Sequence, residues 1–331
     1  MASASETICT LVDRRGAVAN RDVVRALGVS PATAHRLLQA LAERGVLQLF
    51  GKGPASRYCL RRIRRRFRRD GLEEDRAWSG VAEAIARVRR IPPEESRSLR
   101  YAATEVINNA VEHSRGSSVT VAVDFAAGST VTRVQDDGVG VFRRVCEDFG
   151  FPTPEEAIVQ LEKGKLTSDP TQHSGEGLFF SSKAVARFRL ESQGIAWIVD
   201  NVVVDSAVAG SVVNRGTRVV LDVVRGRTPR LEDVFRAYTD AETLRFTKTR
   251  TTVKLGVLSS ALISRSEAKR LVSGLTKFKH VTLDFSGVEI VGQGFCDEVF
   301  RVFARAHPQV ILEPVGTNTA VGFMVARALA I

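Results

Sequence analysis

The sequence predicts a multidomain α/β protein, and three observations support this prediction. The chain has 331 residues, a length that suggests two or three domains. Its excess positive charge is concentrated in the first 70 residues, where several short helical patterns follow one another. In the last third of the chain, strand and helix patterns alternate regularly, which is typical of βαβ units.

The net charge of +11 is unevenly distributed along the chain. Residues 1–70 contain 15 Lys and Arg against 5 Asp and Glu, a net of +10, so the other 261 residues together carry +1. A basic module joined to a neutral remainder favours contact between one segment and a polyanion. A solvated basic surface that only aids solubility is the alternative.

The composition excludes several other classes of protein. Apolar residues make up 44% of the chain, which is enough for packed cores and excludes wholesale disorder. The four cysteines are scattered without a CxxC pair, which argues against a zinc site and a disulfide framework. No apolar run approaches the roughly 18 residues of a membrane span, and the N-terminus lacks a secretory pattern. We therefore expect a cytoplasmic protein that does not contact a membrane.

The first 62 residues show three short helical patterns followed by two strand-like runs. Helical patterns cover residues 5–13 and 20–27, and a third begins at Ser30-Pro31 and ends at Gly45. A glycine turn between two short helices indicates a helix-turn-helix. The two strand-like runs flank residues 51–54, as in a β-hairpin.

This order of elements resembles a winged-helix DNA-binding domain, and residues 29–47 are similar to the recognition-helix region of bacterial winged-helix repressors. The resemblance covers about residues 5–62 and implies that the third helix enters the major groove of double-stranded DNA. Thr33, Arg36 and Gln39 would reach base edges. Lys52 and Arg57 of the hairpin would contact phosphates. Some winged helices dock proteins instead, which is the alternative.

An arginine-rich run follows directly, with seven arginines among residues 61–69. No packed core could hold so many guanidinium groups, so we expect the run to face solvent or phosphate. If about five of them met DNA, the log–log salt slope of binding would be about −4.5. We take residues 63–93 as an Arg-rich and helical linker. The run adds four residues to the predicted DNA contacts: Arg61, Arg62, Arg64 and Arg65.

Four short motifs follow one another in the central part of the chain. A helix over residues 94–114 carries Glu105 and Asn109 on the side opposite its apolar residues, in the spacing ExxxN. A DxGxG motif at 136–140 follows a strand, GEGL at 175–178 opens a helix, and GT at 216–217 precedes another strand. Each motif alone is weak, whereas their order is specific.

In this order the motifs resemble those of the GHKL ATPase superfamily, which includes gyrase-type, histidine-kinase and anti-sigma-kinase ATP-binding domains. The resemblance covers about residues 94–225 and implies a Bergerat α/β sandwich that binds ATP and Mg²⁺. Asp136 would accept a hydrogen bond from the adenine amino group. Gly138 and Gly140 would let the backbone approach the base. The neighbouring Asp137 is interpreted as a solvated turn residue.

The same resemblance assigns residues to the phosphates and the metal. Asn109 would offer its side-chain oxygen to Mg²⁺, and Gly175 and Gly177 would bring phosphate to a helix N-terminus. Thr217 would help near the phosphates. Glu105 is in the place of the general base of ATP-hydrolysing members, although a structural role or a switch without turnover stays open.

Other features of this region indicate which branch of the superfamily it resembles. The predicted lid covers residues 142–174, where Lys163 and Lys165 either touch phosphate or form a charged loop face. The GEGLFF segment lacks the second glycine of GxGLG, and none of the five histidines is in a phospho-acceptor context. Ordinary histidine autokinase activity is therefore not expected, and the motifs look closer to the anti-sigma-kinase branch.

The C-terminal region has the pattern of a small βαβ domain. Residues 226–249 are polar and read as a helical linker, and residues 250–331 alternate three strands with three helices. Where STAS antagonists carry a phosphorylated Asp-Ser, this chain has Gly292-Gln293, so the acceptor hydroxyl is missing. The segment 291–300 is most similar to the STAS-like domain of unknown function called DUF4325.

Two classes of function follow from these resemblances. The first is a transcriptional regulator in which the nucleotide state of the GHKL domain controls the winged-helix domain. The second is an anti-sigma-type protein-serine kinase or ATPase that acts on a partner protein. Double-stranded DNA is the expected partner, and the sequence leaves open a protein partner of the STAS-like domain and a homodimer.

Overall fold

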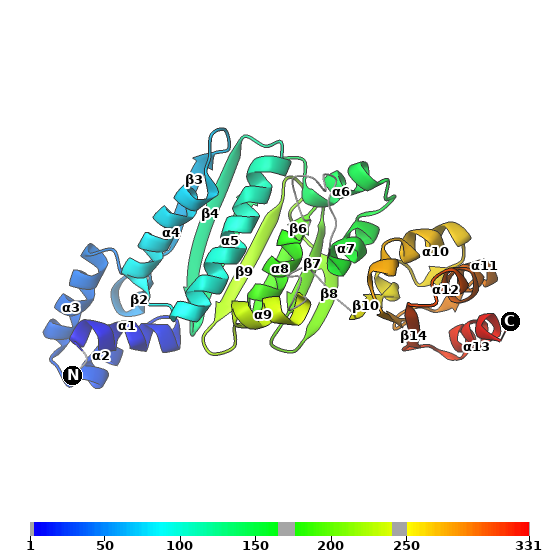
Figure 1. Cartoon of the computed structure of the whole chain (residues 1–331). Coiled ribbons are helices and arrows are strands. Elements are labelled where there is room, and N and C mark those ends of the chain that lie inside the picture. The colour runs from blue at the N-terminus through cyan, green and yellow to red at the C-terminus, as the bar shows by residue number, and fades with distance from the viewer. Residues whose placement is uncertain (1–2, 165–175, 240–249, 331) are drawn as a thin grey trace. The chain divides into compact units, whose positions relative to one another are not determined.

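The computed structural model describes residues 3–164, 176–239 and 250–330, which form two compact units (Figure 1). The first unit contains Met1–Val141 and Phe180–Leu231, and the second contains Phe142–Phe179 and Glu232–Ile331. Within the described part of the chain, no helix has both the length and the apolar character that crossing a membrane requires.

The N-terminal module has the predicted helix-turn-helix and wing. Its elements are α1 (Ala4–Arg15), α2 (Asn20–Leu27), α3 (Pro31–Glu43) and the antiparallel hairpin of β1 (Leu47–Phe50) and β2 (Arg57–Leu60). The Ser30 side chain caps α3 by accepting a hydrogen bond from the Thr33 amide. Ala34, Leu38 and Leu41 of α3 are buried and contribute to the core of the module.

The rest of the first unit is built on an antiparallel sheet of seven strands in the order β3-β4-β5-β9-β6-β7-β8. The strands are β3 (Ile63–Arg68), β4 (Ser118–Ala126), β5 (Ser129–Asp136), β6 (Arg187–Ser192), β7 (Ile195–Asp200), β8 (Asp205–Gly210) and β9 (Arg218–Val224). Helices α4 (Glu74–Val88) and α5 (Pro93–His113) lie on one face (Figure 1). The residues predicted for the apolar side of α5 are all buried: Leu99, Ala103, Val106, Ile107 and Ala110.

The segment 63–93, expected from the sequence to be a linker, is instead part of this sheet unit. Strand β3 pairs with β4 as an edge strand, and α4 packs beside α5. Along β3 the side chains alternate, so that Ile63 is buried and Phe67 is half-buried while Arg64 and Arg66 are exposed. An edge strand can be stable with only a few apolar residues on the face that packs on the protein. In β3, Ile63 and Phe67 are these residues, so an arginine-rich run can still be a strand.

The last arginine of the run stabilises the end of helix α5. Arg69 donates a hydrogen bond from Nη1 to the Val111 carbonyl oxygen at 3.0 Å and one from Nε to the Gly116 carbonyl oxygen at 2.7 Å. Cations are favourable at the C-terminal end of a helix, where carbonyl oxygens lack partners. Arg69 is therefore occupied within the fold.

A buried ion pair joins the N-terminal module to the sheet unit. Arg89 follows α4 and has 8% of its surface exposed; its guanidinium donates to the Asp13 carboxylate of α1. The same group donates to the carbonyl oxygens of Ser129 and Ala126 and to Thr130 Oγ1. Burial lowers the pKa of Arg89 to about 10, so it remains charged at neutral pH.

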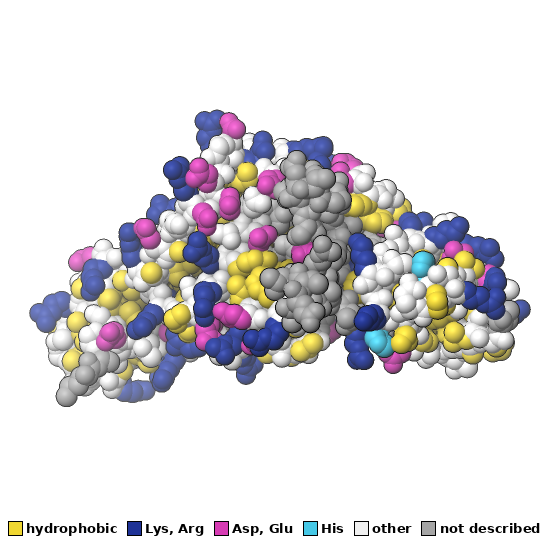
Figure 2. Space-filling view, in the orientation of Figure 1, with side chains coloured by type: hydrophobic (Ala, Val, Ile, Leu, Met, Phe, Trp, Pro, Cys, Tyr) yellow, Lys and Arg dark blue, Asp and Glu magenta, His cyan; other side chains and the backbone are white. Residues whose placement is uncertain are grey.

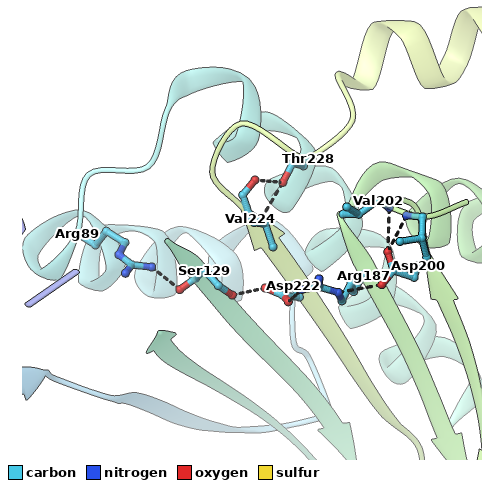
Figure 3. Close-up of polar contacts among 9 residues, drawn as sticks. Arg89, Ser129, Arg187, Asp200, Val202, Asp222, Val224 and Thr228 are labelled. Carbon is cyan, nitrogen blue, oxygen red and sulfur yellow. Dashed lines mark hydrogen bonds and ion pairs between the residues drawn. The ribbon is translucent and has the colours of Figure 1, made fainter. Parts of the chain in front are cut away.

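Polar contacts continue from Arg89 across one end of the sheet (Figure 3). Ser129 Oγ donates to Asp222 of β9, and Arg187 of β6 bridges Asp222 and Asp200 of β7. Asp200 in turn accepts hydrogen bonds from the amides that follow β7. This chain of contacts lies at the Ser129 end of β5, whereas Asp136 is at the other end.

The second unit has the predicted βαβ core. Strands β10 (Arg250–Lys254), β12 (His280–Asp284) and β14 (Ile311–Val315) form a parallel sheet in the order β10-β12-β14, and α10 (Arg265–Val272) and α13 (Thr319–Leu329) are its longest C-terminal helices. A π-helical segment, Asp297–Phe303, connects α11 (Gln293–Cys296) and α12 (Ala304–Ala306). Phe295, Val299 and Phe300 are buried in the core of this unit.

Several elements of the second unit were not expected from the sequence. Two-residue strands β11 (Ala261–Leu262) and β13 (Ile290–Val291) form a small parallel pair. The segment predicted as a lid forms α6 (Val141–Phe149) and α7 (Pro154–Lys163), with residues 165–174 outside the described part. Two other helices agree with the sequence: α9 (Leu231–Tyr238) lies in the predicted helical linker 226–249, and α8 (Gly177–Ala184), the helix expected after the GEGL motif, spans the boundary between the units.

We predict that Asp13→Ala destabilises the first unit strongly. Removing the carboxylate leaves the Arg89 guanidinium buried without its counter-charge, which costs about 3–5 kcal/mol. Urea unfolding followed by tryptophan fluorescence measures this, since both tryptophans, Trp78 and Trp197, are buried in the first unit. The control Asp75→Ala removes an exposed ion pair with Arg100 and should cost less than about 1 kcal/mol. Equal effects of the two variants would contradict this role of Asp13.

Candidate functional site

Asp136 is a buried carboxylate at the end of the central strand β5, with 5% of its surface exposed. Its Oδ1 accepts hydrogen bonds from the Gly138 amide at 2.9 Å and the Thr217 amide at 3.2 Å. Burial raises the pKa of Asp136, while these hydrogen bonds act in the opposite direction. Both amides bond Oδ1, and a hydrogen bond with the Thr217 side chain also acts on the carboxylate, which is thus fixed in one orientation.

The two glycines of the DxGxG motif are required by close backbone contacts. A Cβ atom on Gly138 would overlap the carbonyl oxygen of Ser114, and one on Gly140 would overlap the Ser192 hydroxyl. Gly140 also has φ +93°, a conformation that side chains strongly disfavour. The loop after β5 can therefore be built only with glycine at these two positions.

Asp137 has a structural role that the sequence reading missed. Its Oδ1 accepts from the amides of Ser117 and Ser118 at 2.7 and 2.9 Å, and its Oδ2 accepts from both serine hydroxyls. The Ser117 hydrogen bond is the largest of the effects that hold the pKa of this carboxyl well below its usual range. Asp137 therefore fixes the loop to the start of β4 and is more than a solvated turn residue. The serine pair before the strand is the signal that could have indicated this.

The DxGxG loop packs on the C-terminal end of helix α5. Ser114, which caps this helix, accepts a hydrogen bond from the Val139 amide at 2.9 Å and also contacts Gly138. Asn109 lies five residues before Ser114, about 7.5 Å along the helix axis, and Glu105 lies one turn further back. The DxGxG loop therefore contacts the C-terminal end of α5, and the ExxxN motif lies on the turns of α5 that precede this end.

Thr217 lies against Asp136. Besides its amide contact with the carboxylate, its carbonyl oxygen accepts from the Asp136 amide at 3.0 Å, and its Oγ1 accepts from the Val141 amide at 3.0 Å. The sequence reading gave Thr217 a place near the phosphates, whereas the structure puts it beside the buried carboxylate. The reason is that β9, which begins at the next residue, is the sheet neighbour of β5.

Glu105 and Asn109 are partly exposed on the polar side of α5. Burial raises the pKa of Glu105, and the carboxylates of Glu112 and Glu74 raise it further. A raised carboxyl pKa suits a group that must take a proton near neutral pH.

The structure describes only some of the residues that were predicted to bind phosphate. Gly177 is the first residue of α8, while Gly175 and Lys165 lie outside the described residues. Lys163, for which the sequence allowed a phosphate contact or a charged loop face, does neither. It ends α7 with 3% of its surface exposed, and its ammonium is hydrogen-bonded inside the second unit.

The protein would supply few of the ligands of a bound metal ion. Among the described residues, no group of three or more His, Cys, Asp or Glu side chains is arranged to hold a metal ion. A Mg²⁺ ion would fit a different arrangement, in which Asn109 supplies one oxygen and phosphate and water supply the others. The amide oxygen of Asn109 is a suitable ligand for such a hard cation.

The predicted base-contacting residues share helix α3 of the N-terminal module. Arg36 and Gln39 are exposed, whereas Thr33 is half-buried and its hydroxyl lies 3.0 Å from that of Ser30. In the wing, Lys52 is exposed at the tip, and Arg57 is half-buried and donates to the Ser56 carbonyl oxygen.

The arginine run divides between the two faces of β3. Arg61, Arg62, Arg64 and Arg65 are all exposed. Arg62 also forms an ion pair with Asp124 of β4. Arg64 and Arg65 are consecutive strand residues and so point to opposite faces of the sheet. Around α4 and α5, acidic and basic side chains are interspersed, as expected for the neutral remainder (Figure 2).

Comparison with protein families identifies three regions of the chain. Residues 10–49 match the IclR helix-turn-helix domain, residues 71–198 the histidine kinase-like ATPase domain, and residues 267–321 the STAS-like domain of unknown function, DUF4325. The chain thus contains a helix-turn-helix, a histidine kinase-like ATPase and a STAS-like region, in that order. The predicted domain types and order are confirmed. No curated protein matches the chain. Because the histidine kinase-like match begins at residue 71, α4 belongs to the ATPase domain.

We predict that Asp136→Asn weakens ATP binding roughly 10- to 150-fold. A hydrogen bond to a charged acceptor contributes about 1.5–3 kcal/mol, and the substitution removes the charge while keeping the size of the side chain. Isothermal titration with ATP and Mg²⁺ measures the affinity. Asp205→Asn, on the exposed edge strand β8, is the matched control and should bind ATP like the unaltered chain. Unchanged affinity in Asp136→Asn would remove this residue from the adenine site.

Proposed function

We propose that this protein is a DNA-binding transcriptional regulator in which ATP, bound by the histidine kinase-like domain, controls the helix-turn-helix domain. The observation that carries the proposal is the buried Asp136 carboxylate in a loop that only glycines can form, in the same compact unit as the helix-turn-helix. A kinase acting only on a partner protein would have no use for a DNA-binding module.

In the proposed nucleotide site, the Asp136 carboxylate accepts a hydrogen bond from the adenine amino group. Gly138 and Gly140 keep the adjacent backbone free of side chains, so that the base can approach closely. Thr217 orients Asp136 through its amide. Selectivity for adenine would follow because a base without an amino group at that position could not donate a hydrogen bond to the Asp136 carboxylate.

The proposed hydrolytic step uses the polar side of α5. Glu105 would take a proton from a water molecule that attacks the γ-phosphorus. The bond from this phosphorus to the β–γ bridging oxygen would break, with ADP as the leaving group and inorganic phosphate as the other product. Mg²⁺, when bound through Asn109, would neutralise charge on the phosphates. The raised pKa of Glu105 makes its carboxylate a better base than an ordinary glutamate.

Control of DNA binding would have to cross the length of the sheet. The candidate nucleotide loop is at the Asp136 end of β5, and the helix-turn-helix module is attached at the Ser129 end, about 26 Å away for an eight-residue strand. ATP can shift DNA affinity only if it binds two arrangements of the protein with different affinity. The buried Asp13–Arg89 pair makes the attachment firm enough to transmit such a shift.

We predict that Glu105→Gln abolishes ATP hydrolysis and leaves ATP binding intact, as measured by phosphate release and by titration. Hydrolysis by the unaltered chain should increase as pH rises through the pKa of Glu105, because the base must be deprotonated. This inflection should lie above the roughly 4.3 of an ordinary glutamate.

Glu112→Gln provides the matched control on the same helix. It should retain hydrolysis and move the inflection to lower pH, since it removes a negative charge that raises the pKa of Glu105. Unchanged turnover in Glu105→Gln would exclude Glu105 as the base.

We also predict steep salt dependence and nucleotide dependence of DNA binding by the full chain. With about four phosphate contacts, the log–log slope of affinity against salt should be about −3.6. The affinity should differ between ATP, ADP and no nucleotide, as measured by fluorescence anisotropy with a mixed-sequence duplex at two salt concentrations.

In the same assay, Arg36→Ala should weaken DNA binding, whereas Arg76→Ala, an exposed arginine of α4, should not. Absence of binding at low salt would refute the DNA-binding role. Transfer of labelled phosphate to a protein, together with nucleotide-independent DNA binding, would favour the partner-kinase alternative.

A further inference from the structure

One face of the seven-stranded sheet carries an arginine on every second strand. The strand registers align Arg64 of β3 with Ala122 of β4, and Ala122 with Arg133 of β5. They also align Arg133 with Val220 of β9, and Val220 with Arg189 of β6. Residues aligned in this way on neighbouring strands project from the same face. Three arginines therefore form one row across five strands, separated by small or apolar residues.

This row lies on the side of the sheet opposite α4 and α5. The next residues along two of its strands, Val134 and Leu221, point toward the helices and have at most 2% of their surface exposed. By contrast, Arg64 is exposed, and the side chains of Arg133 and Arg189 keep 39% and 36% of their surface exposed. The row is therefore accessible to a partner.

A buried carboxylate holds one end of the row in place. Glu191 has 2% of its surface exposed and forms ion pairs with Arg189 at 3.0 Å and with Arg218 at 2.5 Å. Ser211 Oγ donates to it at 2.9 Å, and Arg189 Nη2 donates to the Gly210 carbonyl oxygen at 3.3 Å. One carboxylate between two guanidinium groups leaves a net charge of +1. Each guanidinium has five N–H donors, so most of these donors lie outside the pair with Glu191.

The carboxylate at the other end of the row is also shared between two arginines. Asp124 forms ion pairs with Arg62 and with Arg133, so this group again keeps a net charge of +1. Arg64 adds a further positive charge on the edge strand. The sheet thus gathers positive charge partly from residues beyond position 70, which together carry a net of only +1.

The charge has the opposite sign two residues along the same strands. There the registers align Asp222 of β9 with Arg187 of β6 and Arg187 with Asp200 of β7, and Arg187 bridges the two aspartates (Figure 3). One arginine between two carboxylates leaves a net charge of −1. A polyanion on this face would be attracted to the arginine row and repelled by this second row, so the charges define where it can lie.

A shallow hollow of about 700 Å³ covers part of the row. Its lining includes Arg133, Arg189 and Arg218 together with the apolar side chain of Val220. A sugar–phosphate backbone offers contacts for both kinds of group, because its phosphate oxygens can accept from the arginines while its sugar carbons can pack on the valine.

The spacing of the row favours an extended polyanion over a single small anion. Neighbouring strands are about 4.8 Å apart, so successive arginines of the row lie about 10 Å apart and the row spans about 19 Å. Double-stranded DNA carries one negative charge per roughly 1.7 Å of its axis, which gives about eleven charges over that length. One duplex could therefore contact all three arginines.

We propose that this arginine face, defined by Arg64, Arg133, Arg189 and Arg218, is a second contact surface for the phosphate backbone of double-stranded DNA. The inference rests on the proposed DNA binding and adds to it a contact made by the ATPase sheet, which shares one compact unit with the helix-turn-helix. Phosphate contacts position a duplex without reading its sequence, so this face would strengthen binding to every sequence alike.

The test compares the full chain with a double variant, Arg133→Gln and Arg189→Gln. Arg218 is kept so that the buried Glu191 retains a counter-charge. The matched control combines Arg76→Gln and Arg87→Gln on α4, which removes the same charge from exposed positions on the other side of the sheet.

The salt dependence of duplex binding is the first measurement, made by fluorescence anisotropy. Contacts on the arginine face add to the slope of about −3.6 that four contacts of the N-terminal module would give. Each phosphate contact contributes about 0.9 to the log–log slope, so the double variant should bind more weakly and lose about 1.8 of the parent's slope. The control should keep the parent's slope.

Chemical protection of the unaltered chain is the second measurement, and it does not depend on the variants. Phenylglyoxal modifies accessible guanidinium groups, and mass spectrometry identifies the modified residues. With duplex bound, Arg133 and Arg189 should be modified more slowly, whereas Arg87 of α4 should be modified at its original rate. The same experiment with single-stranded RNA of equal charge identifies the preferred polyanion.

The outcomes separate this inference from the proposed function. If the parent binds duplex DNA but the double variant keeps its slope, or Arg133 and Arg189 are not protected, the arginine face is an ordinary solvated surface and the inference is refuted while the helix-turn-helix contact stands. An equal loss of slope in the control would also refute it, as would stronger protection by RNA than by duplex. If the parent fails to bind DNA even at low salt, the proposed function fails, and the inference fails with it.

Discussion

The buried ion pair between Arg89 and Asp13 is the interaction on which the arrangement of the first unit depends. It ties the first helix of the DNA-recognition module to the strands β4 and β5 of the ATPase sheet. A buried charge without its partner is costly, so the two parts cannot separate freely. The helix-turn-helix module is thus joined to the sheet by a buried contact within one compact unit, besides the covalent chain. Any nucleotide signal would then reach α3 through the sheet.

Charge along the chain has more than one purpose. Of the arginines between residues 61 and 69, some stay exposed on the edge strand β3, where charge also discourages pairing with another chain. Arg69 caps helix α5, and Arg62 pairs with Asp124. Only part of the +10 of the first 70 residues is therefore free to meet a polyanion. The excess positive charge favours a polyanion as partner, while the fold decides which basic side chains can contact that polyanion.

The candidate nucleotide site shows how much local sequence can predict. Asp136, Gly138 and Gly140 could be identified because a sharp turn beside a buried carboxylate needs these residue types at this spacing. The roles of Asp137, Ser114 and Thr217 could not, because they depend on contacts with residues 20 to 80 positions away. Strand β3 was missed for a related reason. An edge strand needs few apolar residues, and its pairing with β4 is invisible in an arginine-rich run.

The sequence by itself determined the three domain types, their order, the helix-turn-helix and its wing, and the βαβ alternation at the C-terminus, since these follow from local periodicity, caps and turn residues. Only the tertiary structure decided which parts belong together. Lys163 reads as a surface lysine in any helical pattern, yet it is buried against α10 because three acceptors converge there. Likewise, α4 and β3 join the sheet and α7 joins the STAS-like domain. Packing between segments that are distant in the chain decides to which unit each element belongs. Periodicity within one segment carries no information about such packing.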